Sequence, residues 1–223
     1  MKVSKKRILI IGGTGGIGSA IALLLAKKRA RLVLVSRGTV NFEYENDLKS
    51  QLDRMKADHL FLKYDVSIND HCIRLVDEVI SFLGGIDILI HCAGGQFSGS
   101  IRDLKADDWL SSFNVHLHSA FYLSKLIYPE MLKNINSLMI FISSASSFRY
   151  PSDSVAYSTA NSSLIHFAKC IAKEFYSEGI RVNCIAPGFV DTQFHKGPKE
   201  SSMRKAVEQR IPLGRYAKAV EIA

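Results

Sequence analysis

The stretch RILIIGGTGGIGSAIALLLAKK, residues 7–28, joins a short apolar run to a glycine-rich turn and then to a segment with helical periodicity. Gly12 permits a tight turn, Gly16 lets the backbone approach a pyrophosphate, and Gly18 lets the helix pack close to a sheet. The free amides at the positive end of such a helix bind anions. The stretch therefore predicts a dinucleotide site, and a tight turn without a ligand is the simpler alternative.

The rest of the chain repeats the alternation of strand and helix. Further short apolar runs lie at 31–36, 59–64, 87–92, 137–143 and 180–186, and helical segments are expected at 17–29, 43–57, 69–83, 103–133 and 155–178. Near-continuous apolarity is typical of strands that are covered on both faces. The pattern predicts an α/β fold: a single Rossmann-like, doubly wound parallel sheet with helices on both faces. No linker interrupts it, so residues 1–223 are expected to form one domain.

The last part of the chain differs in character. Residues 187–213 are polar and rich in loop formers, with the amphipathic piece SSMRKAVEQRI inside them. Such a segment suits a substrate lid over a site at the carboxyl ends of the strands. The sequence then stops at AKAVEIA, within what reads as a new helix.

Composition excludes several classes of protein. Of 223 residues, 47% are hydrophobic and 22% charged, which is ordinary for a globular protein in water. No apolar run approaches the roughly 18 residues of a membrane span, and the start of the chain lacks a signal-peptide cleavage pattern. A membrane is therefore not an expected partner. A nucleic acid is not expected either, because the basic residues are scattered. The formal charge of +8 reflects either a lysine-rich surface or an anionic ligand.

The four cysteines are far apart and show no metal-ligand spacing, so no metal is expected. They lie in apolar segments at Cys72, Cys92, Cys170 and Cys184. Buried, reduced thiols of this kind are typical of a cytoplasmic protein.

The end of the second predicted strand bears on the choice of cofactor. An acid at this point would bind the ribose hydroxyls of NAD, but the chain has Ser36 and Arg37. A guanidinium suits the 2′-phosphate of NADP, so NADP is favoured and NAD stays possible. Asp65 ends the third strand, where it could face the adenine. Ser67 is expected to cap the next helix.

Taken together, these motifs resemble the short-chain dehydrogenase/reductases, in particular the forms similar to 3-oxoacyl-(acyl carrier protein) reductases. The resemblance spans residues 7 to 223. It rests on the glycine motif Ile11-Gly12-x3-Gly16-Ile17-Gly18, on Asp65-Val66, His91-Cys92-Ala93-Gly94 and Asn114, on Ser144 thirteen residues before Tyr157, and on IRVNCIAPGFVDT (180–192) and IPLGRYAKAVEIA (211–223).

The resemblance implies a site and a reaction. A hydride passes between nicotinamide and a carbonyl or carbinol carbon, Tyr157 gives or takes the proton, and Ser144 holds the oxygen. The catalytic set carried over is Ser144, Tyr157, Asn114 and Asn161. The cofactor-binding set is Gly12, Thr14, Gly15, Gly16, Ile17, Gly18, Ser36, Arg37, Asp65, Val66, Cys92, Ala93, Gly94, Tyr157, Asn161, Pro187, Gly188, Val190 and Thr192.

Three departures from the family pattern stand out. Asn161 replaces the lysine of Y-x3-K, His91 and Cys92 replace two asparagines, and the strand that usually follows E-I-A is absent from the sequence. In the family the lysine clamps the ribose and lowers the pKa of the tyrosine. A cation within ~4–6 Å lowers such a pKa by about 1–3 units, so its loss forfeits roughly 1.4–4 kcal/mol of phenolate stabilisation.

The missing cation predicts a slow reductase that oxidises alcohols poorly at neutral pH, because reduction needs a protonated tyrosine and oxidation needs the phenolate. His91, His116 and His118 are candidates for a substitute cation, although core or surface histidines are the more common case. Lys169 lies three turns past Tyr157, too far to reach the same ribose.

The substrate is expected to be a small carbonyl compound, either a free ketone or an acyl chain on an acidic carrier. Six aromatic or polar residues follow strand ends and suggest a partly aromatic pocket, although ordinary loop packing is the alternative: Gln96, Phe97, Phe148, Tyr150, Phe189 and Phe194. The helices at 103–133 and 155–178 carry apolar positions beyond one face. In similar proteins these helices form the dimer faces of a tetramer, so a homo-oligomer, dimer or tetramer, is expected.

A second hypothesis comes from another class of protein. Asn161 and the absent last strand would also suit a dinucleotide-binding pseudoenzyme that acts as a sensor or scaffold. Retention of Ser144, Tyr157 and Asn114 favours the reductase.

Overall fold

The computed structural model describes residues 3–38, 42–134, 136–194 and 201–223. Its main sheet has the strand order β3-β2-β1-β4-β5-β6, and every neighbouring pair is parallel. The strands are β1 (Arg7–Ile11), β2 (Arg31–Ser36), β3 (Asp58–Lys63), β4 (Ile88–His91), β5 (Leu138–Ile142) and β6 (Arg181–Ile185). All six lie at the predicted runs, within two residues at each end.

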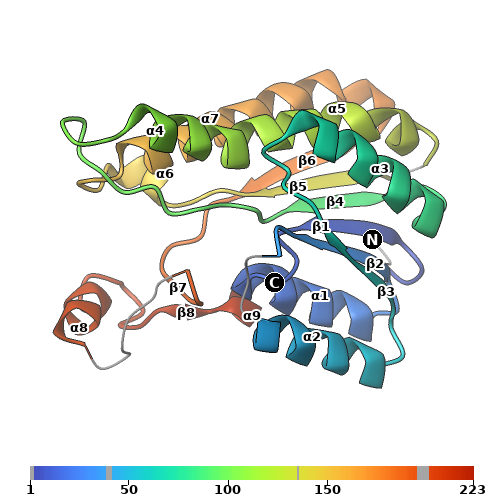
Figure 1. Cartoon of the computed structure of the whole chain (residues 1–223), viewed down its shortest axis with the longest axis horizontal. Helices are drawn as coiled ribbons and strands as arrows, with labels where there is room; N and C mark the ends of the chain where they lie inside the picture. Colours follow the sequence, from blue (N-terminus) through green and yellow to red (C-terminus); the bar gives the residue numbers. More distant parts are fainter. Residues whose placement is uncertain (1–2, 39–41, 135, 195–200) are drawn as a thin grey trace.

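Helices cover both faces of this sheet (Figure 1). One face carries α1 (Gly16–Lys27) and α2 (Phe42–Arg54); the other carries α3 (Asn69–Leu83), α4 (Ala106–Phe113), α5 (Ser119–Leu132) and α7 (Val155–Glu174). Side chains of a strand point alternately to the two faces, so Ile8 and Ile10 join the core under α1, whereas Leu9 and Ile11 join the opposite core. The doubly wound fold is confirmed.

The predicted helix over 103–133 is interrupted in the structure. A π-helical turn, Asn114–His118, separates α4 from α5. The hydroxyl of Ser119, which follows this turn, donates to the Val115 carbonyl at 2.7 Å, and π-turns of this kind often mark functional sites. The interruption was not predicted, because the hydrophobic periodicity continues through it.

The start of α3 corrects one expectation. The residue before this helix is Ile68, and no side chain caps it. Ser67 instead donates from its backbone amide and its hydroxyl to Asp65 Oδ1, at 3.0 and 2.6 Å. The predicted capping role of Ser67 is therefore wrong, because the Asp65 carboxylate captures both donors within the turn.

The last part of the chain forms a small second layer. Val190–Asp191 (β7) pairs in parallel with Ala217–Lys218 (β8), and Ala219–Ile222 (α9) packs against α1. The amphipathic piece of the expected lid forms α8 (Ser202–Glu208), which lies below β6 and away from the main sheet (Figure 1). Part of the lid, residues 195–200, lies outside the described residues. A short helix α6 (Ser146–Arg149) and a 3₁₀ turn (Tyr176–Glu178) complete the described elements.

Candidate active site

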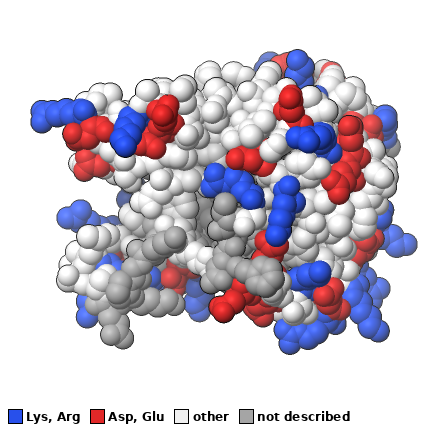
Figure 2. All heavy atoms as spheres, viewed as in Figure 1, with Lys and Arg blue, Asp and Glu red and all other residues white. Residues whose placement is uncertain are grey.

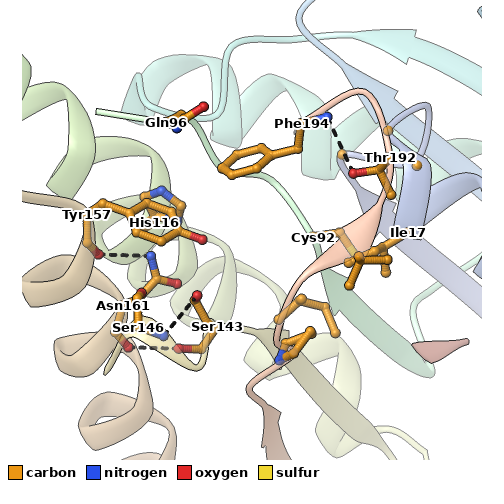
Figure 3. Close-up of a pocket in the computed structure, with 18 of the residues that line it drawn as sticks. Ile17, Cys92, Gln96, His116, Ser143, Ser146, Tyr157, Asn161, Thr192 and Phe194 are labelled. Carbon is orange, nitrogen blue, oxygen red and sulfur yellow. Dashed lines mark hydrogen bonds between the residues drawn. The ribbon is translucent and has the colours of Figure 1, made fainter. Parts of the chain in front are cut away.

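A cavity of about 1230 Å³ opens where β1, β2, β4, β5 and β6 end (Figure 3). Its wall is built from the carboxyl ends of these strands, from α7 and from the segment that follows β6. Nearly all of the predicted site residues line it: Gly12, Thr14, Gly15, Gly16, Ile17, Gly18, Ser36, Arg37, Val66, Cys92, Ala93, Gly94, Ser144, Tyr157, Asn161, Pro187, Gly188, Val190 and Thr192. The topology thus joins segments that lie far apart in the sequence.

The glycine turn is shaped by close contacts. Gly12 has φ 73°, and a Cβ there would lie 2.8 Å from the Ala93 nitrogen. A Cβ on Gly18 would lie 2.2 Å from the Gly12 carbonyl oxygen, which is too close for any side chain. These contacts explain why glycine stands at both positions.

The start of α1 has unused hydrogen-bonding capacity. Gly15 precedes the helix without a capping side chain, so the first-turn amides face the cavity end of the helix. The Thr14 hydroxyl is buried and has no hydrogen-bond partner among the described residues. A buried polar atom without a partner is costly unless a ligand satisfies it. Donors of this kind fit the diphosphate of a dinucleotide.

The end of β2 carries the residues that bear on cofactor choice. Arg37 is exposed and lines the cavity, and Ser36 is buried. The Ser36 oxygen accepts from the Gly38 amide at 3.2 Å and donates to the Glu45 carboxylate at 3.4 Å. The guanidinium of Arg37 is thus the positive group at this corner of the cavity.

Two predicted site residues lie outside the cavity wall. The Asp65 carboxylate accepts from Ser67, as described above, while its neighbour Val66 lines the cavity. Asn114 lies at the start of the π-helical turn, where its Oδ1 is 2.8 Å from His118 Nδ1.

Tyr157 and Ser144 both line the cavity. Burial raises the pKa of Tyr157 above its ordinary value, and the nearby Ser144 hydroxyl opposes this only in part. The phenol is therefore protonated at neutral pH.

Asn161 is turned toward its own helix. Its Nδ2 donates to the Tyr157 backbone carbonyl at 3.0 Å, and its backbone oxygen accepts from the Ser143 hydroxyl at 3.0 Å (Figure 3). Only 1% of the residue is exposed. An amide carries no charge, so residue 161 does nothing to lower the pKa of the neighbouring phenol.

The histidines do not replace the missing cation. His91 is fully buried, and its Nε2 lies 2.7 Å from the Ser119 hydroxyl. Burial lowers the pKa of His91 to about 3 and that of His116 to about 4, so both are neutral at pH 7. Of the three candidates only His116 lines the cavity.

The predicted aromatic pocket is formed in part. Phe97, Phe189 and Phe194 line the cavity together with Gln96, and the Phe194 ring lies 6.0 Å from that of Tyr157. Phe148 and Tyr150 do not line it; they are 61% and 85% exposed.

Several lining residues were not predicted. They come from the turn between β5 and α7 and from the expected lid, and they include Ser143, Ser146, Ser152, Asp153, Ser154, Gln193, Ile211, Pro212 and Leu213. The Ser146 hydroxyl is buried and has no partner among the described residues. Nothing in the local sequence marks these positions, because only the folded turns bring them to the cavity.

Comparison with known proteins agrees with this geometry. The short chain dehydrogenase family model matches residues 6–202. The 3-oxoacyl-[acyl-carrier-protein] reductase FabG of Thermotoga maritima is 30% identical over 225 aligned positions, covering 100% of this chain and 89% of that protein. The human 3-oxoacyl-[acyl-carrier-protein] reductase is also 30% identical, over 96% of this chain and 86% of that protein.

Solved structures show the same architecture. A short chain dehydrogenase from Burkholderia cenocepacia in complex with NADP superposes with a TM-score of 0.91 at 25% identity, covering 100% of this chain and 89% of that one. A short-chain dehydrogenase/reductase from Serratia marcescens gives 0.91 at 26% identity with the same coverage. The chain therefore belongs to the short-chain dehydrogenase family of oxidoreductases.

Proposed function

We propose that this protein is an NADP(H)-dependent carbonyl reductase in which Tyr157 donates the proton. The observation that carries the proposal is that Tyr157 and Ser144 line the same cavity as an uncapped helix start and the Thr14 hydroxyl, which has no partner among the described residues. One end of the cavity offers donors for a diphosphate, and the other offers a hydroxyl pair for a carbonyl oxygen.

Different residues of the cavity bind the cofactor and the substrate oxygen. A bound nicotinamide cofactor supplies the hydride. The glycine turn and Thr14 hold its diphosphate, and Thr192 packs against Gly16 beside that turn. Ser144 holds the substrate oxygen, and Tyr157 delivers its proton to that oxygen as the negative charge develops.

The protonation state of Tyr157 favours carbonyl reduction over alcohol oxidation. The phenol is protonated at neutral pH because burial raises its pKa and residue 161 supplies no cation. Reduction uses the protonated form that is already present. Alcohol oxidation needs the phenolate, which is scarce below the raised pKa.

For the cofactor we favour NADP over NAD. Arg37 at the end of β2 is the positive group at the corner expected to receive the adenosine ribose. A guanidinium binds phosphate through a planar set of donors. The relative from Burkholderia cenocepacia was solved with NADP, which agrees with this choice.

The substrate proposal is an apolar carbonyl compound, either a free ketone or a 3-oxoacyl group on a carrier. Phe97, Phe189 and Phe194 give the cavity an aromatic part, and two of the most similar relatives are 3-oxoacyl-carrier reductases by name. On the face shown in Figure 2, Lys and Arg are interspersed with Asp and Glu, so no single basic area marks a docking site for a carrier there.

We also propose a cytoplasmic location and a homo-oligomeric state for the protein. All four cysteines are free thiols, which suits a cytoplasmic protein. No helix in the described ranges is long and apolar enough to cross a membrane. On α5, Phe121 and Leu132 are each 46% exposed, which supports a homo-oligomer built on this helix.

A dinucleotide-binding pseudoenzyme is the second candidate, and Asn161 is the observation that favours it. Such a protein would bind the cofactor in the same cavity without turning over a carbonyl. Retention of Ser144 and Tyr157 in the same cavity favours the reductase.

The test combines binding with turnover. NADPH and NADH fluorescence titrations measure cofactor affinity, and a panel of ketones and 3-oxoacyl thioesters is then assayed with each cofactor. We expect NADPH binding and slow reduction that the Tyr157→Phe variant loses. Binding without turnover on the whole panel would support the pseudoenzyme, and no binding of either cofactor would overturn both candidates.

A further inference from the structure

His116 occupies a place in the site that the reaction as described does not explain. It lines the cavity from the π-helical turn and is only 3% exposed. Its ring packs so closely on the chain after β4 that a Cβ on Gly94 would lie 2.6 Å from His116 Cε1. On its other side it meets the Tyr157 ring, edge to face, with 5.3 Å between centroids (Figure 3).

The imidazole is tethered through one nitrogen only. Nε2 lies 3.1 Å from the Gly95 carbonyl oxygen and 3.3 Å from the Gly95 amide, so it donates to the first or accepts from the second, according to tautomer. Nδ1 is buried and has no partner among the described residues in either tautomer. A buried polar atom without a partner is costly. A leucine or phenylalanine would fill the same space without that cost.

The position of the Tyr157 phenol depends on its neighbours. The last torsion of a tyrosine side chain is soft, so the chain itself does not fix the tilt of the ring. Among the described residues two rings border it: Phe194, 6.0 Å away on the segment after β7, and His116. His116 is held between a helical turn and the backbone after β4.

We propose that His116 is a positioning residue for Tyr157: its imidazole, anchored to Gly95, sets the tilt of the phenol from which the proton is transferred. The inference rests on the proposed function in taking Tyr157 as the proton donor. In this proposal His116 orients the Tyr157 ring. Residue 161, whose side-chain amide is bonded to its own helix, provides no cation to hold the phenol.

Three variants distinguish the effect of the hydrogen bond to Gly95 from the effect of the aromatic ring of residue 116. His116→Phe keeps an edge-to-face partner and removes the bond to Gly95, whereas His116→Gln keeps a polar group and removes the ring. His166→Gln is the matched control, because His166 is exposed on α7, the helix that carries Tyr157. Urea unfolding checks that each variant is folded, and His116→Leu replaces His116→Gln if the latter does not fold.

The first readout does not need turnover. Protein labelled with ¹³C at the tyrosine Cζ gives one resonance per tyrosine, and the Tyr157 signal is assigned by its loss in Tyr157→Phe. We expect this signal to shift or broaden in His116→Gln, to move less in His116→Phe, and to be unchanged in His166→Gln. An unchanged Tyr157 signal in His116→Gln would overturn the proposal, whether or not the protein proves to be a reductase.

The second readout is kinetic. An edge-to-face pair is worth about 0.5–1.5 kcal/mol, or roughly 2- to 12-fold in rate. We expect kcat of His116→Gln to fall by about that factor, with KM and NADPH affinity unchanged, and His116→Phe to recover most of the loss. A fall that appears equally in NADPH affinity would overturn the proposal, because it would show that His116 merely supports the cofactor site.

Discussion

The side-chain amide of Asn161 donates to the backbone carbonyl of Tyr157, 3.0 Å away and one helical turn earlier in α7. This bond uses the amide nitrogen inside the helix. The amide oxygen remains on the cavity side (Figure 3), so Asn161 offers a ligand an acceptor where the family's lysine would offer a charged donor. A ribose hydroxyl can still donate to that oxygen, but the phenol gains no electrostatic help.

Restoring the cation should change the chemistry of Tyr157. In the Asn161→Lys variant we expect the pKa of the phenol to fall by about 1–3 units and alcohol oxidation at pH 7 to rise about 10- to 1000-fold. Carbonyl reduction should rise less, because its proton donor is already present. The measurement is kcat in both directions from pH 6 to 10.

Asn161→Met is the control for this substitution, since it matches the length of lysine without the charge. If the methionine and lysine variants oxidise alcohols at the same rate, the charge of residue 161 has no bearing on Tyr157.

The unaltered protein should show opposite pH dependences for its two directions. The pKa of Tyr157 is raised by burial, so the protonated form is complete below its ordinary value of about 10 and is lost only as pH rises through the higher folded value. Reduction should therefore stay flat from pH 6 to 9, while oxidation should rise nearly tenfold per pH unit. A reduction rate that halves between pH 7 and 8 would contradict the assignment of Tyr157 as proton donor.

Arg37 should decide between the two cofactors. A hydrogen bond to a charged group contributes about 1.5–3 kcal/mol, so Arg37→Ala should weaken NADPH binding roughly 10- to 150-fold and leave NADH binding within about twofold. Fluorescence titration measures both. Arg54→Ala, an exposed arginine of α2, is the control. Equal losses for NADPH and NADH would mean that Arg37 does not contact a 2′-phosphate.

The close contact between Gly16 and Thr192 allows a steric test of the diphosphate site. A Cβ on Gly16 would lie 2.4 Å from Thr192 Cγ2, so Gly16→Ala must displace that side chain and crowd the helix start. We expect a folded protein whose NADPH affinity is at least tenfold lower. Urea unfolding checks that Gly16→Ala is folded, so that a loss of affinity reports on the site. Unchanged affinity in Gly16→Ala would place the diphosphate elsewhere.

How far the sequence predicts this molecule depends on whether a feature is local. The strand runs and the turn at Gly12 could be predicted, because apolar runs and glycine conformations act within a few residues. The break at Asn114–His118 could not, since the hydrophobic periodicity continues through it. Local reasoning also placed Ser67 at a helix start, where the Asp65 carboxylate captures it instead.

The same distinction applies within the site. Ser144 and Tyr157 line one cavity, and their spacing in the sequence reflects a strand end that faces a helix. The orientation of the Asn161 amide and the contact of His116 with Tyr157 arise from tertiary packing. No spacing in the sequence encodes them.

Acid should destabilise the fold through its two buried histidines. Burial lowers the pKa of His91 to about 3 and that of His116 to about 4, against about 6.5 when unfolded. The unfolded chain therefore binds more protons between about pH 4 and pH 6.5, so the free energy of unfolding falls as pH falls through that window. Each group contributes up to about 1.4 kcal/mol per pH unit, and the pair up to about twice that.

Carboxylates contribute little to the pH dependence of the free energy of unfolding between pH 5 and 6.5. The pKa of Glu221 is lowered to about 2 by Arg215, and that of Asp87 is lowered by its bonds to Arg7 even though burial opposes them. Stability from such groups is lost only below their unfolded pKa values of about 4. The interval from pH 5 to 6.5 therefore reports mainly on histidines.

The measurement is urea unfolding at pH 5.0, 5.5, 6.0 and 6.5. His91 donates from Nε2 to Ser119, whose own proton goes to the Val115 carbonyl, and His91→Gln removes the titrating group while keeping a donor. We expect the slope in this variant to fall by about half, whereas His166→Gln, exposed on α7, leaves it unchanged. A free energy of unfolding that is constant from pH 5 to 6.5 in the unaltered protein would show that His91 and His116 are protonated in the folded state or exposed to solvent.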